Sequence, residues 1–138
     1  MQPGTYTLLV ALDDAPSITF GAAGTRSLDA GWYAYTGSAF GPGGLTRVQR
    51  HRELAAGERD ARHWHIDYLL GHRAASVDAV YATTHDDVEC ATARLLADDA
   101  TPVPGLGASD CTCETHLVFA PTRDALAQRL AEIHDTSL

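Results

Sequence analysis

The sequence has no lysine, so all ten of its basic side chains are arginines, and they face eighteen acidic side chains. The formal net charge of −8 argues against a protein whose whole surface attracts a polyanion. Acidic side chains are strongly hydrated, and salt screens their mutual repulsion, so such a surface suits a protein kept in solution at very high salt. We therefore expect a halophilic protein. The alternative is an ordinary acidic protein from a genome rich in G and C.

Long apolar runs are also absent, because the longest one, residues 8–12, has the length of a strand and is too short to span a bilayer. The chain does not open with a basic region followed by an apolar one, so we expect a cytoplasmic protein without a signal peptide and without membrane association. Cysteines are few: Cys90, Cys111 and Cys113. Their odd number favours reduced thiols or metal ligands over a disulfide framework.

The 138 residues amount to one domain with a core that needs no cross-link. Residues rich in β-formers predict strands at 4–12, 17–20, 31–35, 76–83 and 115–120, with the first two strands in a hairpin. Helical spacing and breaker residues predict helices at 45–56, 65–72, 86–98 and from 121 onward. Residues 100–113 predict a loop of a length that often carries function. The expected fold class is α+β, with a small central mixed sheet flanked by helices.

Positive charge gathers in one segment. Residues 45–73 hold six arginines against four acidic residues, a net charge of +2, while the rest of the chain carries −10. Four of the seven histidines lie in the same segment. If the protein binds nucleic acid, we expect it to do so here.

Two short tyrosine–glycine motifs lie on neighbouring predicted strands: Gly4-Thr5-Tyr6, and Tyr35-Thr36-Gly37 followed by Ser38-Ala39. The predicted helix that follows carries Arg47, Arg50 and His51, whose spacing places them on one face. Glu89 lies near the start of a later predicted helix.

In this order the motifs resemble those of the GIY-YIG nuclease superfamily, from Gly4 to about residue 96. The chain is most similar to an archaeal and bacterial branch in which the domain occurs alone or attached to a base-excision DNA repair enzyme. That similarity extends through residues 62–69 and 107–113. The resemblance implies a GIY-YIG-like fold and a metal-dependent endonuclease of DNA repair or DNA processing, with DNA favoured over RNA.

The resemblance also implies a role for each matching residue. Glu89 matches the metal-binding glutamate, and one carboxylate completed by water and substrate oxygens suits a single Mg²⁺ or Mn²⁺ ion. Arg47 matches the arginine that clamps the phosphate. Tyr6 matches the tyrosine proposed as general base, Tyr35 the tyrosine that orients water and phosphate, and His51 a histidine that assists proton transfer. Because the pKa of a phenol is near 10, Tyr6 would need cations to lower it, and Arg47, Arg50 and the metal are the expected sources.

Further nucleic-acid contacts are expected from Gly37, Ser38, Arg50, Arg52, His63, His65 and Ser109. Two departures from the superfamily pattern stand out. Thr5 and Thr36 occupy positions where isoleucine is usual, which costs a strand little. The asparagine that usually closes the site has no counterpart, although Ser109 or Asp110 could serve.

Each feature has a structural alternative. The tyrosines could pack in the sheet, the arginines could form a solvated helix face, and Glu89 could stabilise a helix dipole. His63 and His65 could converge on an ion with Asp67, or form a loop–helix junction anchored by Trp64 and Ile66.

Cys90, Cys111, Cys113 and His116 offer four zinc ligands, but their spacing is tighter than in a usual zinc knuckle. Buried thiols or a Cys90–Cys111 contact are therefore favoured over zinc. The sequence leaves three functions open: a nuclease first, a non-catalytic nucleic-acid-binding module second, and a small zinc protein last. It points to no protein partner.

Overall fold

The computed structural model describes residues 2–60, 62, 64–106 and 115–138. The strands are β1 (Gly4–Leu12), β2 (Ser17–Thr19), β3 (Thr25–Ser27), β4 (Gly31–Ala39), β5 (Ala75–Thr84), β6 (Thr101–Pro102), β7 (Leu117–Ala120) and β8 (Thr136–Ser137). The helices are α1 (Arg47–Ala55), α2 (His65–Leu70), α3 (Glu89–Asp99) and α4 (Arg123–Ile133), with short 3-10 turns η1 (Gly21–Ala23) and η2 (Gly44–Thr46).

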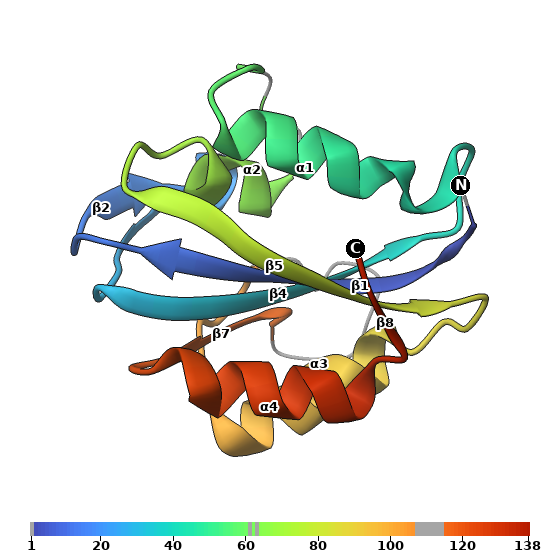
Figure 1. Cartoon of the computed structure of the whole chain (residues 1–138). Helices are drawn as coiled ribbons and strands as arrows, with labels where there is room; N and C mark the ends of the chain where they lie inside the picture. The colour runs from blue at the N-terminus through green and yellow to red at the C-terminus, as the bar shows by residue number, and fades with distance from the viewer. Residues whose placement is uncertain (1, 61, 63, 107–114) are drawn as a thin grey trace.

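Six of the strands form a central sheet in the order β6-β7-β4-β1-β5-β8. Helices α1 and α2 cover one face of this sheet, and α3 and α4 cover the other (Figure 1). We call these the α1/α2 face and the α3/α4 face. The molecule is therefore a three-layer α+β structure, and the expected fold class is confirmed.

Strand β1 is buried on both faces because it lies between the two longest neighbours, β4 and β5. Its side chains alternate between the layers, as the pleat of a strand requires. Leu8 packs in a cluster with Val48 of α1, whereas Leu9 packs with Leu96 of α3 and Leu130 of α4. Leu8 and Leu9 are fully buried, and each contributes roughly 1.5–3 kcal/mol by leaving water.

The structure differs from the expectations in several places. Every pairing in the central sheet is antiparallel, so the sheet is not mixed in strand direction. Residues 17–20 do not form a hairpin with the first strand, because both edges of β1 are occupied by β4 and β5. Instead β2 pairs with β3, a strand that was not predicted, in a separate two-stranded ribbon. Residues 101–102 form the short strand β6, within a segment expected to be only a loop.

Across the part of the chain that is described, none of the helices combines the length and the apolar character that a bilayer crossing demands.

Candidate functional site

The antiparallel register of β1 and β4 brings the two tyrosine–glycine motifs together. Tyr6 lies opposite Gly37, and Leu8 lies opposite Tyr35. Directly opposed residues share a face of the sheet, so both phenols belong to the α1/α2 face. Gly37 is required by the phenol that it faces, because a Cβ atom there would lie 2.6 Å from the Tyr6 Oη atom. The glycine of the second motif therefore makes room for the tyrosine of the first.

Helix α1 places His51 against Tyr6. The Tyr6 Oη atom and the His51 Nε2 atom are 2.8 Å apart, and the imidazole is 1% exposed. Burial lowers the pKa of His51 to about 4, although the carboxylate of Asp67 opposes this shift. His51 is therefore neutral near neutral pH, and its Nε2 atom can accept the phenol proton. Its Nδ1 atom has no hydrogen-bond partner among the described residues.

The pKa of Tyr6 moves in the direction opposite to the one expected. Burial is the largest cause and raises the pKa of Tyr6; the Tyr35 hydroxyl and the Glu89 carboxylate raise it further, and Arg47 lowers it. Burial also raises the pKa of Tyr35, with Glu89 as the next cause. The predicted effect of Arg47 is present but smaller than the effect of burial. Both phenols are therefore protonated in the protein on its own.

Arg47 and Arg50 both lie over the ring of Trp64, with their Cζ atoms 4.9 and 4.6 Å from its centroid. Their polar partners differ. Arg50 donates from Nη1 and Nη2 to the two carboxylate oxygens of Asp67 at 3.0 and 2.9 Å, and Asp67 is fully buried. Arg47 donates to a neutral group, the main-chain carbonyl of Ser38, at 2.6 Å. The two terminal nitrogens of Arg50 are thus bound by a carboxylate. Among the described residues, no carboxylate neutralises the charge of Arg47 in this way.

Thr5 positions Glu89. Its hydroxyl donates to the Asp86 carbonyl at 2.9 Å and accepts from the Val88 N–H at 3.0 Å. These two bonds tie the segment before α3 to β1, next to Tyr6. For the same reason α3 begins at Glu89 and not at residue 86, as the acidic residues had suggested. Thr5 was expected only to replace isoleucine at little cost to the strand. Its role was missed because the full burial of this position is seen only in the structure.

The Glu89 carboxylate lies at the start of α3, close enough to the two tyrosines to raise the pKa of both. It also faces His116, with 3.3 Å between the Glu89 Oε2 and His116 Nδ1 atoms. The side chains are 17% and 1% exposed, respectively. Tyr6 and His51 are therefore bonded to each other on the α1/α2 side of the sheet, with Arg47 on the same helix as His51. The Tyr35 hydroxyl and the Glu89 carboxylate lie near enough to influence the pKa of Tyr6.

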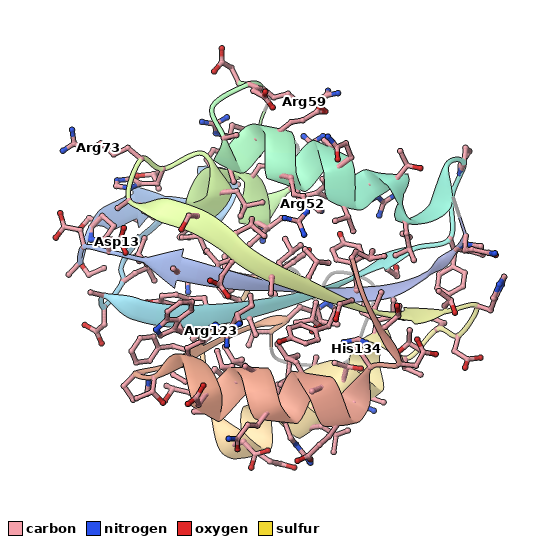
Figure 2. The ribbon with its side chains drawn as sticks, in the orientation of Figure 1. Asp13, Arg52, Arg59, Arg73, Arg123 and His134 are labelled. Carbon is pink, nitrogen blue, oxygen red and sulfur yellow. The ribbon has the colours of Figure 1, made fainter. Side chains whose placement is uncertain are left out.

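The other predicted residues are more scattered. Ser38 is half-buried, and Arg52 donates to the main-chain oxygen of Leu138 at 2.7 Å. His65 is half-buried at the start of α2. Arg59 pairs with Glu53 at 3.2 Å, and Figure 2 shows Arg59 and Arg73 pointing outward on the α1/α2 side. The positive segment is thus partly neutralised by its own carboxylates.

Several predicted positions lie outside the described residues: His63, Ser109, Asp110, Cys111 and Cys113. Cys90 is disulfide-bonded, so the expectation of a reduced thiol is wrong for this residue. A disulfide sulfur is not a thiolate, and it is therefore not a zinc ligand of the expected kind. The sequence has no asparagine at any position, so the residue that usually closes the site in the GIY-YIG superfamily is absent.

The donor atoms at this site suit a divalent cation. Within the described ranges, no group of three or more histidine, cysteine, aspartate or glutamate side chains is arranged to hold a metal ion. Glu89 offers a partly exposed carboxylate beside the buried imidazole of His116. Few protein ligands, completed by water and substrate oxygens, are the usual arrangement for a hard divalent ion that acts on phosphates.

A family model described as a domain of unknown function, DUF123, matches residues 5–138. The match covers the five predicted catalytic residues, and the chain belongs to this family. No curated protein and no solved structure matches the chain.

Proposed function

We propose that this member of the DUF123 family is a metal-dependent endonuclease of the GIY-YIG type, which hydrolyses phosphodiester bonds in DNA. The observation that supports the proposal most is the Tyr6–His51 pair, with Arg47, the Tyr35 phenol and the Glu89 carboxylate near enough to influence the pKa of Tyr6. Phosphodiester hydrolysis needs an activated water, an acceptor for its proton and positive charge on the phosphate. The assignment to DNA repair or processing depends on the sequence resemblance alone.

Arg47 is the residue suited to hold the scissile phosphate. Its guanidinium is already oriented by the Ser38 carbonyl and by the ring of Trp64. Nitrogen–hydrogen groups that remain free of this bond can donate to phosphate oxygens as negative charge develops there. Arg50 has a supporting role instead, since its forked edge is already bound by Asp67.

Tyr6 and His51 are suited to handle the proton. Because His51 is neutral, Tyr6 can donate its hydroxyl proton to the Nε2 atom 2.8 Å away. The lone pairs of the phenol oxygen then remain available to a water molecule, although the pKa of Tyr6 is raised. Tyr35, on the next strand, would orient that water. A Mg²⁺ or Mn²⁺ ion bound at Glu89 would add positive charge beside the phosphate and lower the pKa of water.

The direct test is cleavage of labelled single- and double-stranded DNA in molar salt, with magnesium or with manganese. We expect the wild type to cut, and Glu89→Gln to cut at least about 100-fold more slowly because the ion loses its carboxylate ligand. Glu58→Gln is the matched control, since it removes the same charge from an exposed position. Equal cleavage by Glu89→Gln and the wild type would contradict the proposal, as would the absence of cleavage under every metal.

A second candidate function is a nucleic-acid-binding module without catalysis. The observation that favours it is the raised pKa of both Tyr6 and Tyr35, which leaves no phenolate in the protein alone. Such a module would bind DNA in a salt-dependent way and cut none. Arg47→Ala would weaken that binding more than Arg50→Ala, since Arg50 is occupied by Asp67.

A further inference from the structure

We propose that His116 is a second protein ligand beside Glu89, and that the pair forms a nitrogen–oxygen site that prefers Mn²⁺ over Mg²⁺. This inference rests on the proposed function for the presence of an ion at Glu89. It goes further by naming a second ligand and the class of metal.

The spacing of the two side chains supports a shared ion. The Glu89 Oε2 and His116 Nδ1 atoms are 3.3 Å apart. Neighbouring ligands that each lie about 2.0–2.2 Å from one ion are themselves roughly 3 Å apart. A direct N–H···O hydrogen bond is usually shorter, with a mode near 2.9–3.0 Å. The gap between the two atoms is therefore long for a hydrogen bond but suitable for two ligands of one ion.

The imidazole of His116 is buried, and the polar contact that it makes is with the Glu89 carboxylate. His116 is 1% exposed at its side chain, yet neither ring nitrogen has a hydrogen-bond partner among the described residues. Buried polar atoms in native proteins nearly always have hydrogen-bond partners, so a buried ring whose nitrogens make no hydrogen bond points to a ligand. Because the Nδ1 atom faces a carboxylate, that ligand is expected to be a cation.

Main-chain bonds hold His116 in place. Its N–H donates to the Leu106 carbonyl at 2.9 Å, and its own carbonyl accepts from the Thr36 N–H at 3.1 Å. Glu89 is fixed independently, through the Thr5 hydroxyl that ties the start of α3 to β1. Two ligands on separately anchored segments are pre-oriented, so little conformational entropy is lost when an ion binds.

The chemistry of the pair sets the expected preference. Mg²⁺ takes oxygen ligands almost exclusively and keeps several waters. An imidazole nitrogen suits transition metals, whose affinities rise from manganese toward copper. A site with a carboxylate alone would give no reason to bind one of the two ions more tightly. A nitrogen ligand favours Mn²⁺ over Mg²⁺. The site should therefore bind Mn²⁺ more tightly than Mg²⁺.

The experiment measures metal binding without DNA. Free Mn²⁺ is followed by its electron paramagnetic resonance signal during titration of the whole protein, and Mg²⁺ binding is measured by competition. We expect His116→Gln to weaken Mn²⁺ binding about 10- to 100-fold and to change Mg²⁺ binding much less. His134→Gln is the matched control: His134 is also buried, and both its ring nitrogens bond to threonine hydroxyls, so metal binding should not change.

A second variant covers the case in which His116→Gln fails to fold. His116→Asp replaces the nitrogen ligand with oxygen, so it should bind metal again but with a ratio of Mn²⁺ to Mg²⁺ affinity shifted toward Mg²⁺. Unchanged Mn²⁺ binding in His116→Gln would overturn the inference, and so would an unchanged ratio in His116→Asp. If Mn²⁺ binding depends on His116 but no DNA is cut, the proposed function fails and this inference stands. If DNA is cut while His116→Gln binds Mn²⁺ normally, only this inference fails.

Discussion

Two of the three buried histidines among the described residues, His51 and His134, lie on opposite faces of the sheet, and the bonding of their rings differs. On the α3/α4 face, His134 bonds through both nitrogens, to Thr7 Oγ1 at 2.8 Å and to Thr83 Oγ1 at 2.9 Å. Figure 2 shows this residue in the layer between α4 and the sheet. On the α1/α2 face, His51 bonds to Tyr6 through Nε2, while its Nδ1 has no partner in the described part of the chain.

This difference separates a structural histidine from a candidate catalytic one. A buried polar atom left without a partner costs roughly 1–3 kcal/mol. A fold that leaves such an atom accepts this destabilisation, and functional sites are where such features collect. The two arginines against Trp64 show the same contrast. Arg50 donates to both carboxylate oxygens of Asp67, whereas Arg47 donates to the neutral carbonyl of Ser38.

The largest expected effect is on catalysis, from Tyr6→Phe. Loss of the phenol oxygen should slow DNA cleavage roughly 10²- to 10⁴-fold, because proton transfer loses its acceptor. Stability should fall by only about 1–3 kcal/mol, as His51 loses its bond. Single-turnover cleavage and denaturant unfolding measure the two effects. Tyr33→Phe is the matched control on the same face of the sheet; the Tyr33 hydroxyl donates to the Asp29 carbonyl at 2.7 Å, away from the site. Equal rates in the two variants would contradict the role assigned to Tyr6.

Asp67→Ala should act on stability instead. Asp67 is fully buried, binds Arg50 through both oxygens, and also accepts the Trp64 N–H at 3.0 Å. Removing one partner of such a pair leaves an uncompensated charge and costs about 3–5 kcal/mol. Urea unfolding measures the stability of Asp67→Ala and Arg47→Ala, and a titration measures how tightly each variant binds DNA. We expect Arg47→Ala mainly to weaken DNA binding. If Arg47→Ala destabilised the fold as much as Asp67→Ala, the contrast between the two arginines would be wrong.

The sequence predicts those parts of the site that depend on local patterns. Residues rich in β-formers predicted β1, and helical spacing placed Arg47 and His51 on one helix. The α+β class followed from the same patterns. The features that the sequence did not reveal depend on long-range packing. The direction of the tyrosine pKa shifts follows from burial, and the occupation of Arg50 follows from Asp67, which lies seventeen positions away along the chain.

The tether from Thr5 to the start of α3 shows the same limit more clearly. It joins residues separated by more than eighty positions, and a threonine in a strand gives no indication of which backbone groups its hydroxyl will meet. The predicted pairing of residues 17–20 with the first strand was also wrong, because several strands compete for the two edges of β1. Residues 17–20 are strand-forming, but both edges of β1 are occupied by longer strands. Local propensity does not decide between such partners.

The smallest expected effect is the dependence of stability on pH, which both histidines share. Burial lowers the pKa of His134 to about 4, against the opposing effect of Asp135, and burial likewise lowers the pKa of His51 to about 4. Between that value and 6.5, the ordinary value, the unfolded chain binds more protons than the folded one. The stabilisation is therefore complete above about pH 6.5 and is lost as the pH falls toward 4, by at most about 3 kcal/mol for each histidine.

Denaturant unfolding at about pH 7 and about pH 4.5 would measure this loss. His134→Gln and His51→Gln should each remove a similar share of the pH dependence, because each removes one buried imidazole. Only His51→Gln should also slow DNA cleavage at about pH 7, since only that ring bonds to Tyr6. The two histidines have the same lowered pKa, and they would then be distinguished by the side chains to which their ring nitrogens bond. A variant of His134 that lowered the cleavage rate per folded molecule as much as the His51 variant would remove the distinction between these two histidines.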